Sequence, residues 1–108
     1  MDRDLISTRL EIDIETLRTF CAKWKIVELA LFGSVLAEDF RPDSDIDALV
    51  TFGAGAHGTL WDFIHMREEF EQLVGRRVDL IERAVLKQSR NYIRRSAILG
   101  SAKVIYAA

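Results

Sequence analysis

The sequence predicts an α/β (α+β) fold, in which a small mixed β-sheet of about three strands packs against flanking helices. The predicted element order is α-β-(short α)-β-α-β-α. Two observations lead to this prediction. The chain has 108 residues, of which 49% are hydrophobic, which is enough for one domain with its own core and too little for two. Its apolar residues recur at helical spacing in some segments and at alternate positions in others.

The first half of the chain alternates between helix and strand. An apolar stripe predicts a helix over about residues 7–25, because its members recur at steps of three and four: Leu10, Ile14, Leu17, Cys21 and Trp24. Residues 26–32 are rich in strand formers and stop at Gly33, which predicts the first strand. A short helical turn over 34–39 and a tight turn around Pro42 follow.

The second half is predicted to hold two further strands, over residues 45–52 and 77–82. Between them, Thr59 resembles a helix N-cap with Asp62 as the capping acid, and Gly75 ends the helix. A crossover helix of this length joins parallel strands, whereas the short connection after the first strand predicts that strands one and two are antiparallel. From residue 84 onward the pattern is helical but less regular. Residues 103–106 form either a short strand or the end of that helix.

The composition excludes several classes of protein. Lys and Arg total 15 and Asp and Glu total 17, so the formal net charge is −2, which does not favour a nucleic-acid clamp. No apolar run is long enough to span a bilayer, and residues 1–4 lack the pattern of a signal peptide, so we expect a cytoplasmic protein. Cys21 is alone, which excludes a disulfide framework and a cysteine metal cage.

Two aspartates on the second predicted strand are the most informative residues. Asp45 and Asp47 alternate along the strand, so their carboxylates project from one face about 7 Å apart at the backbone. Two like charges side by side repel, and a divalent cation removes this conflict. Mg²⁺ in particular prefers one or two carboxylates together with phosphates and water. The alternative is a solvated acidic turn that only begins a strand.

Two further features favour a phosphate and metal site. Gly33 and Ser34 follow the first strand, where free backbone N–H groups and a hydroxyl can hold phosphate oxygens, although such a pair is often only a turn. Asp79 lies inside an apolar strand, and the predicted topology brings it next to Asp45 and Asp47. Three carboxylates beside a phosphate-binding turn suit two-metal phosphoryl transfer. The alternative for Asp79 is an ion pair with a neighbour such as Arg76 or Arg77.

These residues resemble a known family. The run Leu31-Phe32-Gly33-Ser34, then ten residues, then Asp45-Ile46-Asp47, and an acid on a later strand are similar to the DNA polymerase β-type nucleotidyltransferase superfamily. The closest resemblance is to its smallest branch, the minimal nucleotidyltransferases (MNT). The similarity also extends over residues 21–50, 60–80 and 98–106, which is nearly the whole chain.

The resemblance implies a function. Residues 1–108 would form a single nucleotidyltransferase domain that transfers AMP from ATP, or from another NTP, to a hydroxyl and releases pyrophosphate. Gly33 and Ser34 would bind the nucleotide. Asp45 and Asp47 would ligate Mg²⁺, and Asp79 would complete a second metal site and activate the acceptor. MNT proteins are commonly antitoxins whose partner is a HEPN toxin, so the implied acceptor is a toxin hydroxyl, such as that of a tyrosine.

One departure from the family pattern leaves alternatives open. Ala37 stands where many MNT sequences carry an arginine, and Arg41 is more simply an exposed turn residue than its replacement. The chain could therefore be a non-catalytic antitoxin that neutralises its partner by binding. It could also be a small-molecule nucleotidyltransferase whose acceptor pocket is completed by a partner subunit or second copy. Either a hetero-oligomer or a homodimer fits these readings.

Several other residues are not expected to carry the chemistry. His57 and His65 lack the spacing of metal ligands, and Cys21 reads as a core residue. The default for the basic cluster Arg90, Arg94 and Arg95 is a solvated face, and its alternative is contact with a nucleotide phosphate or an RNA-binding partner.

Overall fold

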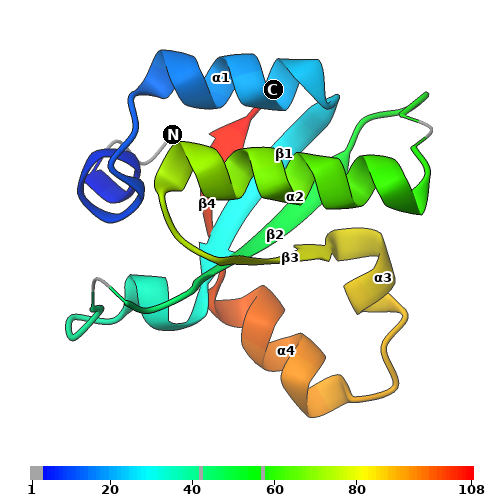
Figure 1. The fold of residues 1–108 in the computed structure, drawn as a ribbon. Coiled ribbons are helices and arrows are strands. Elements are labelled where there is room, and N and C mark those ends of the chain that lie inside the picture. The colour runs from blue at the N-terminus through cyan, green and yellow to red at the C-terminus, as the bar shows by residue number, and fades with distance from the viewer. Residues whose placement is uncertain (1–3, 42, 57) are drawn as a thin grey trace.

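The computed structural model describes residues 4–41, 43–56 and 58–108. Pro42 of the predicted turn and His57 of the glycine-rich loop lie outside these residues. A four-stranded sheet in the order β3-β2-β1-β4 forms the centre of the fold, with helices on either side (Figure 1). The strands are β1 (Ile26–Phe32), β2 (Ile46–Phe52), β3 (Val78–Glu82) and β4 (Lys103–Ala107). The helical elements are η1 (Leu5–Leu10), α1 (Ile14–Lys23), η2 (Gly33–Leu36), α2 (Leu60–Val74), α3 (Arg83–Lys87) and α4 (Tyr92–Ser101).

The strand directions confirm the predicted topology. Strands β1 and β2 are antiparallel, and β2 and β3 are parallel and joined by α2. Strand β2 begins at Ile46, one residue later than predicted, so Asp45 lies just before it. None of the helices in the described part of the chain has the length and apolar character that a membrane span requires.

Both faces of the sheet are covered by helices. On one face, alternate β2 residues such as Ile46 and Val50 pack in a core with side chains of α1 and α2. Figure 1 shows these two helices side by side, and the rings of Phe20 and Phe70 stack between them with centroids 5.0 Å apart. On the other face, Leu86 of α3 and Ile98 of α4 pack against a smaller cluster that includes Ala30, Phe32 and Leu49.

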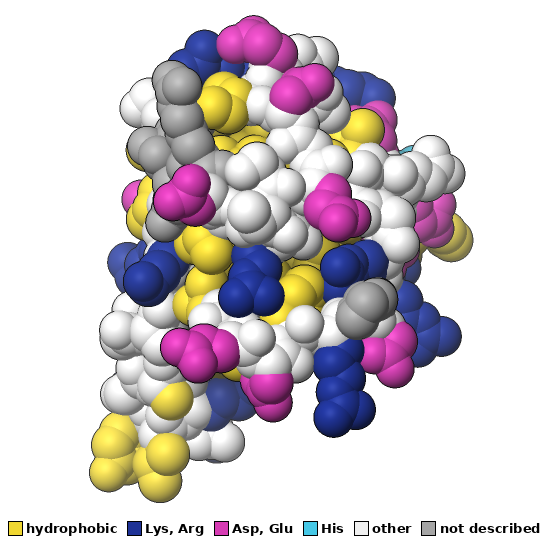
Figure 2. Space-filling view, turned by 90° about the vertical axis from the view of Figure 1, so that its left-hand side faces the viewer, with side chains coloured by type: hydrophobic (Ala, Val, Ile, Leu, Met, Phe, Trp, Pro, Cys, Tyr) yellow, Lys and Arg dark blue, Asp and Glu magenta, His cyan; other side chains and the backbone are white. Residues whose placement is uncertain are grey.

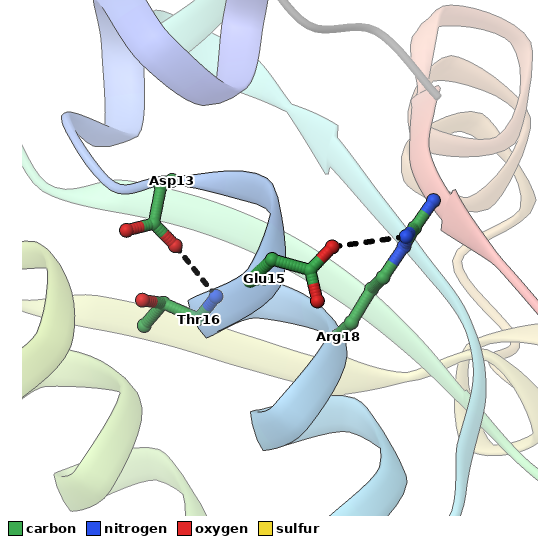
Figure 3. A network of polar contacts seen from close by, with 4 residues as sticks. All are labelled: Asp13, Glu15, Thr16 and Arg18. Carbon is green, nitrogen blue, oxygen red and sulfur yellow. Dashed lines mark hydrogen bonds and ion pairs between the residues drawn. The ribbon is translucent and has the colours of Figure 1, made fainter.

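The first predicted helix is interrupted in the structure. A single helix over residues 7–25 is wrong, because η1 is a π-helix that ends at Glu11, whose φ of 57° lies in the left-handed region. A new helix then starts at Asp13, whose carboxylate accepts a hydrogen bond from the Thr16 N–H at 2.7 Å (Figure 3). The apolar stripe continues through this break, which is why periodicity alone did not reveal it.

The C-terminal region forms two helices and a fourth strand. The irregular helical pattern after residue 84 divides into α3 and α4, and residues 103–107 form β4, which pairs antiparallel with β1. The sheet therefore has four strands instead of about three. Both ends of α2 match the prediction: Thr59 and Asp62 form a capping box at its beginning, and Gly75 ends the helix at a φ of 71°.

Candidate active site

Two predicted site residues lie on neighbouring strands at the same level. Asp47 of β2 pairs with Asp79 of β3 in the parallel register, and Phe32, the last residue of β1, pairs with Asp47 from the other side. Because alternate residues of a strand share a face, Asp47 and Asp79 lie on the face that α3 and α4 cover. Asp45 precedes Asp47 by two residues and extends the acidic set beyond the beginning of β2.

The central aspartate is the one in the least favourable electrostatic environment. Asp45 and Asp79 are exposed, whereas Asp47 is half-buried. Burial raises the pKa of Asp47, and the negative charges of Asp79 and Asp45 raise it further, while the positive charge of Arg94 on α4 lowers it. Asp47 therefore lies where the negative charges of both other aspartates act on it.

The glycine–serine turn contacts the first two aspartates, as the antiparallel arrangement predicts. Gly33 has a φ of 75°, and a Cβ atom added there would lie 2.4 Å from Asp47 Oδ2. Glycine is therefore required both by the backbone conformation and by the close approach of the carboxylate. Ser34 Oγ donates a hydrogen bond to the carbonyl oxygen of Asp45 at 3.4 Å. The turn and the acidic strand thus form one edge of the sheet.

The ion pair considered as the alternative for Asp79 is absent from the described part of the chain. Arg76 donates instead to the carbonyl oxygen of Arg41 at 2.8 Å, and its guanidinium lies 4.4 Å from the ring centroid of Phe40. The salt bridges among the described residues join other side chains and include none of the three aspartates. Asp45, Asp47 and Asp79, here called the acidic edge, thus have no bonded counter-ion among the residues that the structure describes.

The donor set fits Mg²⁺ in the way that nucleotide-binding sites use it. Within the described residues, no group of three or more His, Cys, Asp or Glu side chains is arranged to hold a metal ion by itself. Mg²⁺ does not require such a cage, because it usually takes one or two carboxylates and completes its shell with phosphate oxygens and water. Uncompensated carboxylates next to an exposed glycine–serine turn meet that requirement.

Figure 2 looks onto the side of the molecule where η2 and the beginnings of β2 and β3 lie in Figure 1. Lys and Arg side chains form a band across this side, with Asp and Glu side chains above and below the band. This side of the molecule thus presents side chains of both signs of charge.

One residue near the site was not selected from the sequence. The sequence favours a solvated face for Arg94, whereas in the structure its positive charge acts on Asp47. It lies one helical turn before Ile98, which packs on the same sheet face, and this i to i+4 spacing was the available signal. Ala37, where an arginine was expected, ends η2 and is half-buried.

Other features lie away from the acidic edge. A cavity of about 630 Å³ opens at the opposite end of the strands, lined by residues such as Phe52, Phe63 and Val85, and it contains none of the three aspartates. Burial raises the pKa of Cys21 to about 12, in agreement with a core thiol. His65 is exposed on α2.

Comparisons of the sequence identify one family. Residues 14–102 match the nucleotidyltransferase domain family. Protein adenylyltransferase MntA of Thermococcus cleftensis is 37% identical over 65 residues, which cover 60% of this chain and 64% of that protein. A Methanocaldococcus jannaschii protein assigned as a protein adenylyltransferase is 34% identical over 59 residues, which cover 55% of this chain and 59% of that protein. The chain thus spans about 60% of the length of these curated relatives.

Comparisons of the structure agree with this match. A solved structure assigned as a minimal nucleotidyltransferase is 31% identical, with 95% of each chain covered and a TM-score of 0.64. A chain from the crystal structure of a toxin–antitoxin with AMP-PNP has the same fold at 17% identity, with a TM-score of 0.64 over 87% of this chain and 73% of that one. The fold also recurs in a complex of tri-AMPylated Shewanella oneidensis HEPN toxin with MNT antitoxin, at 16% identity and a TM-score of 0.56, with 87% of this chain and 69% of that one covered.

Proposed function

The chain belongs to the nucleotidyltransferase domain family, and from this premise we propose that it transfers AMP from ATP to a hydroxyl of a partner HEPN toxin. In this role it acts as the antitoxin of a toxin–antitoxin pair, and residues 1–108 work as a single nucleotidyltransferase domain. The observation that carries the proposal is the acidic edge, where Asp47 pairs with Asp79 and contacts the turn at Gly33. The naming of MntA as a protein adenylyltransferase supports the choice of a protein acceptor.

The nucleotide is proposed to bind at the turn that follows β1. Gly33 and Ser34 are exposed, and the free backbone N–H groups at the start of η2 suit the triphosphate oxygens. Asp45, Asp47 and Asp79 are the proposed ligands of Mg²⁺ in a two-ion site. Bound Mg²⁺ supplies positive charge that stabilises the transferring phosphoryl group and lowers the pKa of the attacking hydroxyl.

The transfer itself exchanges one phosphorus–oxygen bond for another. The acceptor oxygen bonds to the α-phosphorus of ATP, while the bond from that phosphorus to the bridging oxygen breaks and pyrophosphate leaves with the electron pair. Asp79 is proposed to receive the acceptor proton, because it is exposed at the edge where a protein hydroxyl can approach. A tyrosine hydroxyl is the proposed acceptor.

Labelled ATP, Mg²⁺ and the product of the adjacent gene provide the test. We expect a mass increase of one or more AMP units on that product, mapped to a tyrosine, and none when Mg²⁺ is chelated. The variant Asp45→Asn with Asp47→Asn should lose the label. The matched control Asp39→Asn with Asp43→Asn, two exposed aspartates on the preceding turn, should keep it.

Protection of cells separates the competing functions. If the Asp45→Asn, Asp47→Asn variant protects cells from the toxin as well as the parent does, the enzymatic antitoxin is rejected in favour of one that acts by binding. Label on a small molecule with none on the protein partner would instead identify a small-molecule nucleotidyltransferase.

A further inference from the structure

The net charge of −2 conceals a strong asymmetry along the chain. After Glu82 the sequence contains no Asp or Glu, yet it carries six basic residues: Arg83, Lys87, Arg90, Arg94, Arg95 and Lys103. The preceding 82 residues carry 9 basic and 17 acidic residues. The basic segment includes all of α3 and α4. Charge concentrated in this way on two neighbouring helices generates a local positive potential that the total charge does not indicate.

The side chains of four of these cations make no hydrogen bond or ion pair with any described residue. Arg83 forms an ion pair with Glu28 at 2.9 Å, and Arg95 donates to the carbonyl oxygen of Ser89 at 2.6 Å. By contrast, the exposed side chains without such a partner among the described residues are Lys87, Arg90, Arg94 and Lys103. The charge of Arg94 also acts on Asp47, whereas the charges of Lys87 and Arg90 on this surface are available to a partner.

The same two helices also expose large apolar side chains. Val85, Tyr92 and Ile93 are 62%, 64% and 70% exposed. Hydrophobic side chains gather at the lower end of the side shown in Figure 2, at the level where Figure 1 draws α4. Exposed apolar side chains together with arginines on one surface are typical of protein interfaces, in which arginine and aromatic residues are enriched.

This surface adjoins the acidic edge. Leu86 and Ile98 anchor α3 and α4 to the sheet face that carries Asp47, in a cluster with Phe32 and Leu49. Arg94 is close enough for its charge to act on Asp47. A protein bound to these helices would therefore lie beside the proposed transfer site.

We propose that α3 and α4 form the docking surface for the acceptor protein, with unpaired Lys87 and Arg90 facing an acidic surface and Ile93 inserted among its apolar side chains. This inference rests on the proposed function, because the proposed HEPN partner is the protein that would dock. A protein fits better than RNA, because Val85 and Ile93 cannot stack on bases and Tyr92 is the one aromatic residue of the two helices.

Binding of the HEPN protein from the adjacent gene tests the inference by calorimetry. We expect the Kd to rise about tenfold or more for Lys87→Glu with Arg90→Glu, because like charges then face each other. Ile93→Ser should weaken binding to a similar extent, as loss of an interface anchor does. High salt should weaken the parent complex. The controls, Arg18→Glu on α1 and Trp61→Ser on α2, should bind within about twofold of the parent, because rim and remote positions contribute little.

The outcomes separate docking from chemistry. AMP transfer by the docking variants should show a raised KM for the partner and an unchanged kcat, because the acidic edge is intact. If these variants bind the HEPN protein as tightly as the parent, the docking surface is wrong while the proposed transfer can stand. If the parent binds this protein and transfers no AMP, the proposed function fails instead. Tight binding of single-stranded RNA that the charge reversals abolish, with HEPN binding unchanged, would also overturn the inference.

Discussion

Gly33 links the backbone of the turn to the position of a carboxylate. Two glycines of the chain, Gly33 and Gly75, have nearly the same φ, 75° and 71°, but differ in their surroundings. A Cβ on Gly33 would meet Asp47 Oδ2 at 2.4 Å, whereas a Cβ on Gly75 would meet nothing within 4 Å. These two positions therefore separate backbone strain from displacement of the aspartate.

We expect Gly33→Ala and Gly75→Ala to lose similar stability, about 1–2 kcal/mol, from the left-handed backbone. Gly33→Ala should in addition reduce AMP transfer about 100-fold or more, because displacing a reacting group by about 1 Å costs that much. Gly75→Ala should transfer at the parent rate. Chemical denaturation and a transfer assay on both variants check this. Equal activity of the two variants would show that the turn does not position Asp47.

We expect the ionised side chain of Asp47 to lower the stability of the metal-free protein. Its pKa is raised chiefly by burial and then by Asp79 and Asp45, so its ionised form is less favourable in the folded state than in the unfolded one. The resulting loss of stability develops as the pH rises from the ordinary value of 3.8 through the raised pKa. At neutral pH without metal this cost is fully present, and bound Mg²⁺ would offset it.

The variant Asp47→Asn should therefore melt at a higher temperature than the parent at pH 7 in a chelating buffer. Below the ordinary Asp pKa the difference should disappear, because the parent side chain is then protonated in both states. Addition of Mg²⁺ and nucleotide should raise the melting temperature of the parent and leave that of the variant unchanged. A variant that melts below the parent at neutral pH would contradict this account.

At the scale of elements, Glu69 joins α2 to α1. Its carboxylate accepts hydrogen bonds from Lys23 and, at 2.9 Å, from the indole Nε1 of Trp24. The Lys23 hydrogen bond is the largest cause of the lowered pKa of Glu69. A lowered pKa means that the stabilisation is present above the unfolded value of 4.5 and is lost as the pH falls through the folded pKa.

Replacing Glu69 by Gln should cost roughly 0.5–1 kcal/mol at neutral pH, the usual value for a partly exposed charged hydrogen bond. Denaturant titrations at pH 7 and at pH values below the folded pKa check this, since the difference should fade once Glu69 is protonated. The exposed neighbour Glu68→Gln is the matched control and should leave stability unchanged. A pH-independent difference would show that packing, and not charge, joins the two helices.

Strand β4 provides a second test at this scale, because it closes the sheet against β1. Ile105 is fully buried, whereas its neighbour Val104 is 41% exposed. Ile105→Ala should cost about 2–5 kcal/mol through lost burial and a cavity. Val104→Ala should cost under about 1 kcal/mol, because strand propensities differ by no more than about this amount between residue types. Equal losses in denaturant titrations would mean that β4 contributes pairing but not packing.

The contrast between these elements explains what the sequence could predict. The capping box at Thr59 and the end of α2 at Gly75 depend on residues within one turn, and both predictions are confirmed. The break at Glu11 was missed because Leu10 continues the apolar stripe across it. The sequence is ambiguous for strand β4, because its partner β1 lies more than 70 residues away and no local signal encodes that pairing.

The candidate site follows the same rule. Parallel β2 and β3 follow from the crossover helix, so the pairing of Asp47 with Asp79 was predictable from topology. The contact of Gly33 with Asp47 follows from the antiparallel β1 and β2. The influence of Arg94 is only partly predictable. Its i to i+4 spacing with Ile98 places both on one side of α4, but its approach to Asp47 depends on how α4 crosses the sheet.

For the whole molecule, Cys21 can report opening of the core. It is fully buried on α1 in the larger core cluster, and burial raises its pKa to about 12. The folded state therefore disfavours the thiolate, so this group lowers stability as the pH rises above its ordinary value of 9.0. The reactive species of a cysteine is the thiolate, so the native thiol is both inaccessible and in its unreactive form.

Labelling of Cys21 by a thiol reagent at pH 8 should consequently occur only through unfolding. Its rate should be about 10³-fold or more below that of the denatured chain. In a domain of ordinary stability, at most about one molecule in 10³ is unfolded at any time. If the helices and the sheet open as one unit, the Ile105→Ala and Glu69→Gln variants should each accelerate labelling by the factor by which they raise the unfolded fraction, about tenfold for each 1.4 kcal/mol of lost stability. Acceleration by Glu69→Gln alone would show that α1 detaches while the sheet stays folded. Labelling of the native parent at the denatured rate would show instead that the core around α1 is not closed in solution.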